Sequence, residues 1–196
     1  MIENSLVLVT LDDAHIEVVK ELERGESDND LLRLLNGIGK AEFSLIGELI
    51  QIYCTADVLC RGLIAMMREH RLGVSSNFAY DLNDKDVLVH TRGEAVKTTL
   101  DIHKDGVISA IETIEMHRIF RHTFSHWIVY KHVNDRYLVA ITKSRLDAIK
   151  RDGVELNDGK AKFAVFRIDD LMTELRKVKA HTKFLADLHF HLETTL

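Results

Sequence analysis

The sequence contains no proline in 196 residues, and it has only two cysteines and one tryptophan. Proline removes a backbone donor and clashes with the preceding helical turn, so its absence favours long uninterrupted helices and argues against a flexible linker. Cys54 and Cys60 lie six residues apart in a segment with helical periodicity. This spacing places them on different faces of one helix, so we expect no disulfide between them and interpret both as small core residues.

The sequence also lacks the patterns that define several common classes of protein. Charged residues interrupt the long apolar runs, and the first residues do not show the basic-then-apolar order of a signal peptide, so we expect a cytoplasmic protein without a membrane anchor. We find no glycine-rich phosphate loop, no serine nucleophile elbow, no His-Glu-x-x-His motif and no nucleotidyltransferase-like Gly-Ser with spaced aspartates. The sequence therefore predicts no cofactor and no metal ion.

Charge is spread unevenly along the chain. The formal net charge of -5 argues against a protein that coats nucleic acid, but residues 1–60 hold 12 acidic and 4 basic side chains, whereas residues 131–183 hold 13 basic and 8 acidic ones. The C-terminal third could offer a basic surface, or its lysines could simply solvate helix and strand faces. Aromatic residues of that region could stack on single-stranded RNA or pack a sheet: Tyr130, Tyr137 and Phe166.

Hydrophobic periodicity predicts an α+β protein that is predominantly α-helical. The expected helices cover residues 12–24, 27–35, 40–70, 84–102, 107–127 and 171–192. The expected strands cover residues 5–10, a hairpin at 128–133 and 136–142, and residues 162–167 after an Asn-Asp-Gly turn at 157–159. Asp169 or Asp170 is the expected cap of the final helix.

No internal repeat, low-complexity tract or shift in composition divides the chain, so we expect a single domain over residues 1–196. Its expected parts are a helical core over residues 40–127, a β-rich appendage over 128–167 and a C-terminal helix over 168–196. Apolar residues recur every three or four positions along residues 40–70, which makes this helix the expected spine of the core. The predicted fold is thus a helical bundle with a small antiparallel sheet and a C-terminal helix.

The helix expected over residues 107–127 carries an unusual concentration of protonatable and cationic side chains. At 100° per residue, its core-facing stripe is predicted to consist of Met116, Phe120, Phe124 and Trp127. The opposite side then carries Arg118, His122, Ser125 and His126, with Arg121 at its margin.

Three interpretations of this polar side are open. In the first, it is a solvated helix face with incidental histidines. In the second, His122 and His126 share a divalent ion, although Glu115 is the one carboxylate within two turns. In the third, Arg121 binds phosphate and His126 transfers protons in a nuclease.

The segment Arg121-His122-x-x-x-His126 resembles the signature of HEPN domains (higher eukaryotes and prokaryotes nucleotide-binding), which are helical bundles. The resemblance covers this motif and the helical layout over residues 40–127, with Arg121 at the family arginine, His122 at the polar position and His126 at the family histidine. It implies a metal-independent endoribonuclease whose two protomers form one composite site, and a toxin or defence role would add a neutralising partner protein. Ile128 stands where one toxin subgroup has tyrosine.

These residue types suit the chemistry independently of the family. Metal-free RNA cleavage requires deprotonation of a 2′-hydroxyl, stabilisation of charge on phosphorus and protonation of the 5′-oxygen. Histidine serves either proton transfer and arginine offers a planar fork of donors to phosphate. A homodimer would supply a second Arg121 and His126, while His122, Ser125 or Arg118 contacts the phosphate.

The expected substrate is RNA and the expected products are a 2′,3′-cyclic phosphate and a 5′-hydroxyl. DNA should resist cleavage because it lacks the 2′-hydroxyl. The alternative from another class is a non-catalytic RNA-binding or dimeric interaction module that uses the same helix. Cation density alone does not separate catalysis from RNA binding.

Overall fold

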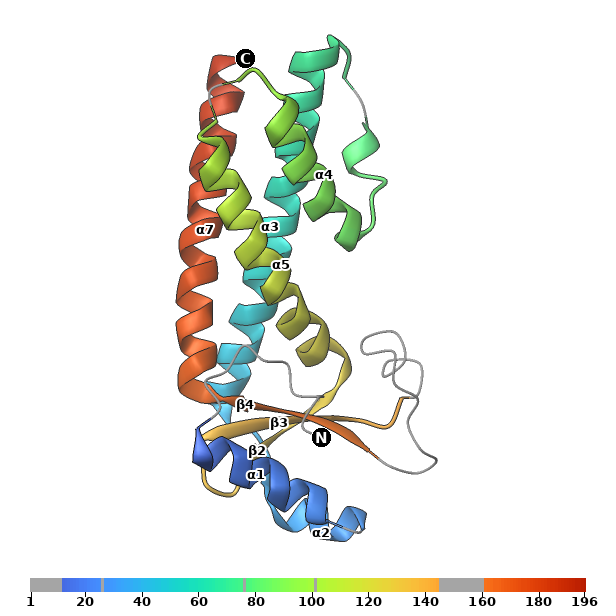
Figure 1. The fold of residues 1–196 in the computed structure, drawn as a ribbon, viewed down its shortest axis with the longest axis vertical. Coiled ribbons are helices and arrows are strands. Elements are labelled where there is room, and N and C mark those ends of the chain that lie inside the picture. The colour runs from blue at the N-terminus through green and yellow to red at the C-terminus, as the bar shows by residue number, and fades with distance from the viewer. Residues whose placement is uncertain (1–11, 26, 76, 101, 145–160) are drawn as a thin grey trace. The chain divides into compact units, whose positions relative to one another are not determined.

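The computed structural model describes residues 12–25, 27–75, 77–100, 102–144 and 161–196 (Figure 1). The protein is α+β and predominantly α-helical, with a small antiparallel sheet, which confirms the predicted fold class. The chain forms two compact units, each built from distant segments. The sheet unit comprises Met1–Ile46 and His122–Thr173, and the helical unit comprises Gly47–Arg121 and Glu174–Leu196.

Three long helices each contribute to both units. They are α3 (Lys40–Leu72), α5 (Lys104–His126) and α7 (Ile168–Thr195). The helical unit also holds a short 3-10 turn, η1 (Asn77–Ala79), and α4 (Asp84–Lys97). The spine predicted over residues 40–70 is therefore confirmed as α3.

The core of the helical unit is built around α3. Its buried positions recur at helical spacing: Tyr53, Ala56, Cys60, Leu63, Ile64 and Met67. The same cluster includes small and branched side chains of α5 and α7: Val107, Ala110, Ile111, Ile114, Val178, Leu185, Leu188 and Leu192. Val87, Leu88 and Ala95 of α4 also belong to it. Among the described helices, α3 is long and apolar enough to cross a membrane, a test that the core helix of a soluble protein also passes.

The two cysteines differ in burial. Cys60 lies in the core, as predicted, and its burial raises the pKa of the thiol to about 12. Cys54 is only partly buried, and both thiols are free. A buried, protonated thiol is a poor nucleophile, so Cys60 acts as a packing residue.

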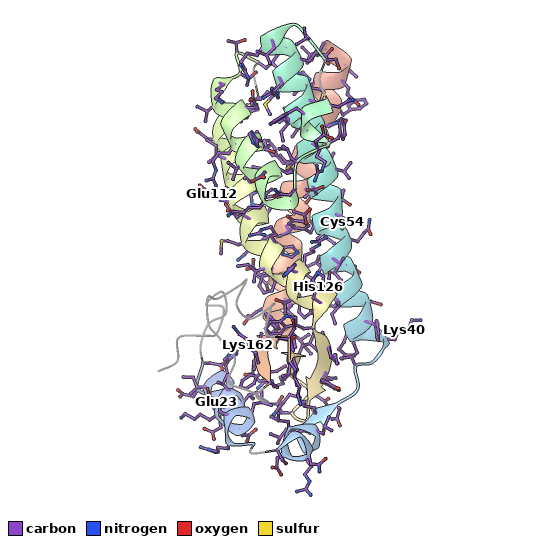
Figure 2. The ribbon with its side chains drawn as sticks, turned by 90° about the vertical axis from the view of Figure 1, so that its right-hand side faces the viewer. Glu23, Lys40, Cys54, Glu112, His126 and Lys162 are labelled. Carbon is purple, nitrogen blue, oxygen red and sulfur yellow. The ribbon has the colours of Figure 1, made fainter. Side chains whose placement is uncertain are left out.

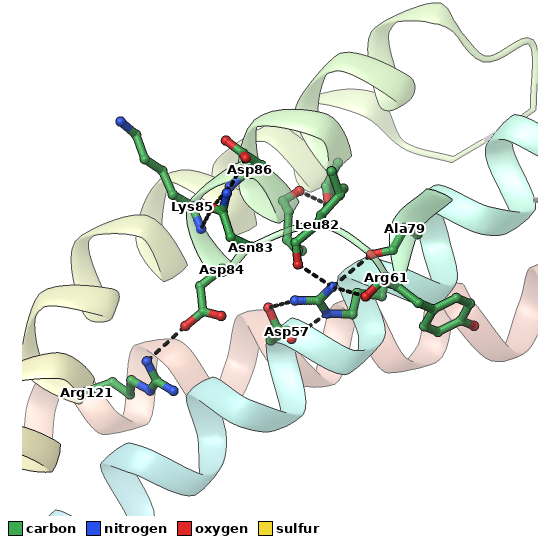
Figure 3. A network of polar contacts seen from close by, with 12 residues as sticks. Asp57, Arg61, Ala79, Leu82, Asn83, Asp84, Lys85, Asp86 and Arg121 are labelled. Atoms are coloured by element: carbon green, nitrogen blue, oxygen red, sulfur yellow. Dashed lines mark hydrogen bonds and ion pairs between the residues drawn. The ribbon is translucent and has the colours of Figure 1, made fainter. Parts of the chain in front are cut away.

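An arginine clasp fixes the segment between α3 and α4 (Figure 3). Arg61 Nη1 donates to the carbonyl oxygens of Ala79 at 2.8 Å and Leu82 at 2.9 Å, while its Nε donates to Asp57 at 2.7 Å. The Asn83 side chain then caps α4 by accepting backbone N–H groups of its first turn. These hydrogen bonds hold the segment between α3 and α4 in place. They could not be predicted from the sequence, which shows only a polar loop there.

The sheet unit contains a four-stranded antiparallel sheet in the order β1-β2-β3-β4. Figure 1 labels β2, β3 and β4. Its strands are β1 (Leu35–Asn36), β2 (Ile128–His132), β3 (Tyr137–Thr142) and β4 (Lys162–Arg167). The predicted hairpin and third strand are confirmed as β2, β3 and β4. The two-residue β1 was not predicted, because a pair of residues is too short to show alternation.

Both faces of this sheet carry buried side chains. On one face, Tyr137, Val139 and Val165 pack with Val18 and Leu22 of α1 (Asp13–Arg24). On the other face, the buried residues are Leu138, Ala140, Ala164 and Phe166. The ring of Phe166 lies 5.0 Å from that of Phe124, centre to centre. Tyr137 and Phe166 are therefore core residues, and the option that they stack on RNA from the sheet is wrong.

Several predicted boundaries shift for local reasons. The second helix, α2 (Asp28–Arg33), has the expected Ser27 cap but ends before residue 35, because β1 pairs with β2. α4 ends at Lys97 rather than at residue 102, because the next residue, Thr98, takes an extended backbone conformation. α7 begins at Ile168, so Asp169 and Asp170 lie in its first turn rather than at its cap. The strand predicted at 5–10 and the turn at 157–159 lie outside the described residues.

Candidate functional site

The motif lies at the end of α5, which terminates at His126 (Figure 2). The boundary between the compact units falls within this helix, so Arg121 belongs to the helical unit and His122 and His126 to the sheet unit. The predicted core stripe is confirmed for the three aromatic residues Phe120, Phe124 and Trp127. It is wrong for Met116, whose side chain is exposed.

A histidine occupies the core position that the sequence assigned to Met116. His117 is 1% exposed, and its Nε2 lies 3.3 Å from the carbonyl oxygen of Leu49. Burial lowers the pKa of this imidazole, and the neighbouring Leu49 carbonyl and Glu174 charge offset the effect only in part. The spacing of His117 from the buried Ile114 and Phe120 could have revealed this position, since all three fall on one helix face.

Arg121 is held by an ion pair within the helical unit (Figure 3). Its Nη1 donates to Asp84 Oδ2 at 2.9 Å, and the guanidinium carbon lies 5.6 Å from the ring centre of Tyr53, within cation–π range. Burial raises the pKa of the Tyr53 phenol, an effect that the Asp84 charge reinforces and the charges of Arg118 and Arg121 oppose. The guanidinium is thus oriented before any ligand binds.

Asp84 is the site residue that sequence reasoning missed. It is the first residue of α4, 37 positions before Arg121, and its sequence context shows only that a helix starts there. A single acidic residue at a helix start is common because it complements the helix dipole. Its contact with Arg121 depends on tertiary packing, which a single sequence does not report.

Two imidazoles lie together in the last turn of α5. The ring centres of His122 and His126 are 4.5 Å apart, with their planes tilted by 54°. His126 and Ser125 are exposed, while His122 and Arg118 are partly buried, so none of the predicted polar-side residues enters the core. The prediction that the two histidines share one side of the helix is confirmed.

A pocket of about 440 Å³ opens beside His126 within the sheet unit. Its walls come from α2, β1, β2 and β3 and are mainly apolar: Leu31, Leu32, Leu35, Ile128, Tyr130 and Ile141. The side chains that carry polar groups are His126, Tyr130, Thr142 and Lys143. This pocket could not be predicted from the sequence, because its lining comes from segments about 100 residues apart.

In the part of the chain that the structure describes, no further ligand joins His122 and His126 to complete a metal site. There, no three His, Cys, Asp or Glu side chains are grouped so that they could hold a metal ion. Glu115, the carboxylate closest to the histidines in sequence, instead lies 3.6 Å from Arg92. Two imidazoles alone are a weak metal site.

Comparison with protein-family models, curated proteins and solved structures finds no match to this chain. The HEPN resemblance therefore rests on the motif and on the helical layout, and membership of that family stays a prediction. The helical unit contributes an anchored arginine, and the sheet unit contributes two adjacent imidazoles and a pocket bordered by one of them.

Proposed function

We propose that this protein is a HEPN-like, metal-independent endoribonuclease that cleaves RNA to 2′,3′-cyclic phosphate and 5′-hydroxyl ends. The observation that carries this proposal is the pair of imidazoles, 4.5 Å apart between ring centres, in the turn of α5 that follows Arg121. RNA cleavage requires two proton transfers, and histidine is the side chain that proteins most often use as a general acid or base.

In the proposed mechanism the two histidines divide the proton transfers. One imidazole accepts the proton of the ribose 2′-hydroxyl, and the other, in its protonated form, donates a proton to the leaving 5′-oxygen. The exposed His126 is the group placed to meet the substrate, and the half-buried His122 completes the pair. This gives His122 a larger part than phosphate orientation, which was its predicted role.

Arg121 supplies the positive charge that the transition state needs. A guanidinium keeps its charge at any physiological pH and offers donors to two phosphate oxygens. On one helix, side chains five residues apart diverge by about 140°, so Arg121 and His126 of the same chain aim in different directions. We therefore propose a homodimer in which Arg121 of one chain acts with the histidines of the other.

The decisive experiment is an RNA cleavage assay in EDTA with purified wild type, Arg121→Ala and His126→Ala. Matched controls are Arg33→Ala, at an arginine whose side chain is 82% exposed, and His191→Ala, at an exposed helical histidine. We expect the wild type and both controls to cleave mixed single-stranded RNA, and both motif variants to lose at least about a hundredfold in rate. DNA of the same sequence should remain intact.

The products provide a second check on the mechanism. Cyclic phosphate ends resist phosphatase until they are opened by acid, and 5′-hydroxyl ends accept phosphate from a kinase. Absence of cleavage by the wild type, or equal cleavage by all five proteins, would remove the ribonuclease proposal. A cytoplasmic toxin or defence role, with a neutralising partner protein, would then lose its basis as well.

The Arg121–Asp84 ion pair favours one alternative, a non-catalytic module that binds RNA or a second copy through the same helix. In that case the pair serves as a structural lock, and Arg121 is not needed for chemistry. RNA binding by the wild type without any cleavage would support this alternative. A filter-binding assay on the same five proteins separates the two functions.

A further inference from the structure

We propose that the pocket beside His126 is a nucleobase-binding subsite that selects the nucleotide next to the cleaved bond. This inference rests on the proposed function, because it assigns a role to the pocket within RNA cleavage. The pocket lies wholly within the sheet unit, and His126 forms part of its wall. A ligand that fills it therefore contacts the imidazole assigned to proton transfer.

The size and walls of the pocket suit a flat, mainly apolar ring. Its volume of about 440 Å³ falls in the range of pockets that hold small ligands, about 300–1,000 Å³. Apolar side chains from α2, β2 and β3 form the walls, and the Tyr130 ring lies among them. Aromatic side chains are the usual stacking platforms for unpaired bases in RNA recognition.

The polar groups of the lining suit the rest of a nucleotide. The Thr142 Oγ1 accepts the backbone N–H of Ser144 at 3.1 Å, and its hydroxyl proton can be donated to the edge of a base. Lys143, an exposed residue that follows β3, adds a positive charge for a phosphate. His126 adds an imidazole to the same lining. One pocket thus presents a stacking ring, a hydrogen-bonding hydroxyl, a cation and a proton carrier, which together match a nucleoside 3′-phosphate.

Apolar side chains at the pocket are exposed to solvent, which supports the binding of a separate molecule there. Leu32 is 53% exposed and Ile128 is 65% exposed, although both line the pocket. Large apolar groups that face solvent beside a cavity commonly mark a binding site. The aromatic and cationic members of the lining favour a nucleobase over the purely apolar side chain of a second copy.

The first test measures binding without requiring cleavage. The four ribonucleoside 3′-monophosphates are titrated into the wild type, Tyr130→Leu and Leu32→Glu, and binding is followed by NMR shifts. We expect saturable binding of at least one nucleotide, weakened roughly fivefold or more by Tyr130→Leu, which keeps apolar bulk but removes the stacking ring. Leu32→Glu should weaken it further, because it brings a carboxylate to the phosphate.

Matched controls change the same residue types elsewhere. Tyr80→Leu and Val58→Glu replace residues of the helical unit that are 62% and 67% exposed, and they should bind nucleotides as the wild type does. Circular dichroism and thermal unfolding show whether each variant is folded. Because Leu32 is exposed, its substitution should leave the fold intact, and a folded Leu32→Glu protein keeps the test valid if Tyr130→Leu unfolds.

The second test maps cleavage sites in a random RNA pool. We expect the wild type to prefer one base class next to the cleaved bond, and Tyr130→Leu to flatten this preference by at least about fivefold while it also slows cleavage. Cleavage without base preference, or nucleotide binding that is equal in all variants, would overturn the subsite. If the wild type cleaves no RNA, the ribonuclease proposal fails, and the nucleotide titration alone decides the pocket. A dimer that Leu32→Glu dissociates, with no nucleotide bound, would assign the pocket to a second copy.

Discussion

At the scale of single residues, the ion pair of Arg121 with Asp84 is the contact that most affects the proposed chemistry. The two side chains are 28% and 44% exposed, so solvent screens their attraction. Asp84 orients the guanidinium, but its negative charge also opposes the approach of phosphate. The pair thereby sets both the geometry and the affinity of the proposed phosphate site.

We predict that Asp84→Asn tightens RNA binding by roughly two- to fivefold, because exposed ion pairs contribute up to about 1 kcal/mol and the asparagine keeps a hydrogen-bond acceptor in place. Binding is measured by fluorescence anisotropy in a His126→Ala background, where cleavage does not interfere. Asp86→Asn, on the same helical turn, is the control. If the gain persists when Arg121 is also changed to alanine, Asp84 does not act through Arg121.

A second residue-scale prediction concerns the buried His117. Burial lowers its pKa in the folded protein, so the unfolded chain takes up a proton near pH 6.5 while the folded chain does not. Stability therefore rises with pH through this window and is lost as the pH falls below 6.5, by at most about 1.4 kcal/mol per pH unit for one group. His15, also buried, contributes with the same sign.

Urea unfolding at pH steps between 5 and 8 measures this dependence. We expect His117→Gln to reduce the slope of the unfolding free energy against pH below pH 6.5, because glutamine does not titrate. Glutamine can still donate to the Leu49 carbonyl oxygen, so the buried contact is kept. The slope should not vanish, since His15 remains. If the unfolding free energy of His117→Gln depends on pH as the wild type's does, the His117 imidazole binds protons equally in the folded and unfolded states, which would contradict this prediction.

At the scale of helices and strands, much of the fold could be predicted from periodicity. The α3 spine, the β2–β3 hairpin and β4 follow from spacing alone, because each is long enough to show its period. Features fixed by contacts between distant segments could not be predicted. Among them are β1, which exists only because it pairs with β2, and the clasp in which Arg61 binds the carbonyl of Ala79.

The candidate site divides in the same way. That His122 and His126 share one side of α5 could be predicted from helix geometry. Asp84 could not, because it reaches Arg121 from another helix, and neither could the pocket, whose walls come from α2 and the sheet. Apolar character alone predicts Met116 in the core, but the structure buries His117 there, because a neutral imidazole fills a core position without a full charge to desolvate.

The junction of α3 and α4 offers a prediction at this scale. Glu94 of α4 is 2% exposed, and it accepts hydrogen bonds from Arg71 at 2.8 Å and from Arg68 at 3.4 Å. Removing the buried carboxylate leaves two guanidinium groups without their acceptor, so we expect Glu94→Ala to destabilise the protein by about 2–4 kcal/mol. Chemical denaturation measures the loss.

The control for this change is Glu69→Ala, which removes an exposed carboxylate of α3 and should alter stability by less than about 0.5 kcal/mol. Glu94→Gln keeps an acceptor but not the charge, and its cost should fall between the two. Equal stability of Glu94→Ala and the wild type would mean that apolar packing of α3 against α4 holds the junction without these ion pairs.

At the scale of the whole molecule, the proposed mechanism depends on two chains. Arg121 and His126 diverge on their shared helix, so one chain does not aim both at one phosphate. We predict twice the chain mass in solution and a specific activity that falls on dilution, because dissociation separates the arginine from the histidines. Sedimentation velocity and cleavage rates across a range of protein concentrations measure the two effects.

Mixing inactive variants tests the shared site directly. Arg121→Ala retains both histidines and His126→Ala retains the arginine, so a mixed dimer holds one complete site when each site draws on both chains. Random exchange makes half of the dimers mixed, and an equal mixture should regain about a quarter of the wild-type activity. Exchange of subunits is ensured by incubation at low concentration, and each variant incubated alone is the control. A monomer whose activity per chain is independent of concentration, with no recovery on mixing, would place the arginine and the histidines of each site in one chain and contradict the dimeric mechanism.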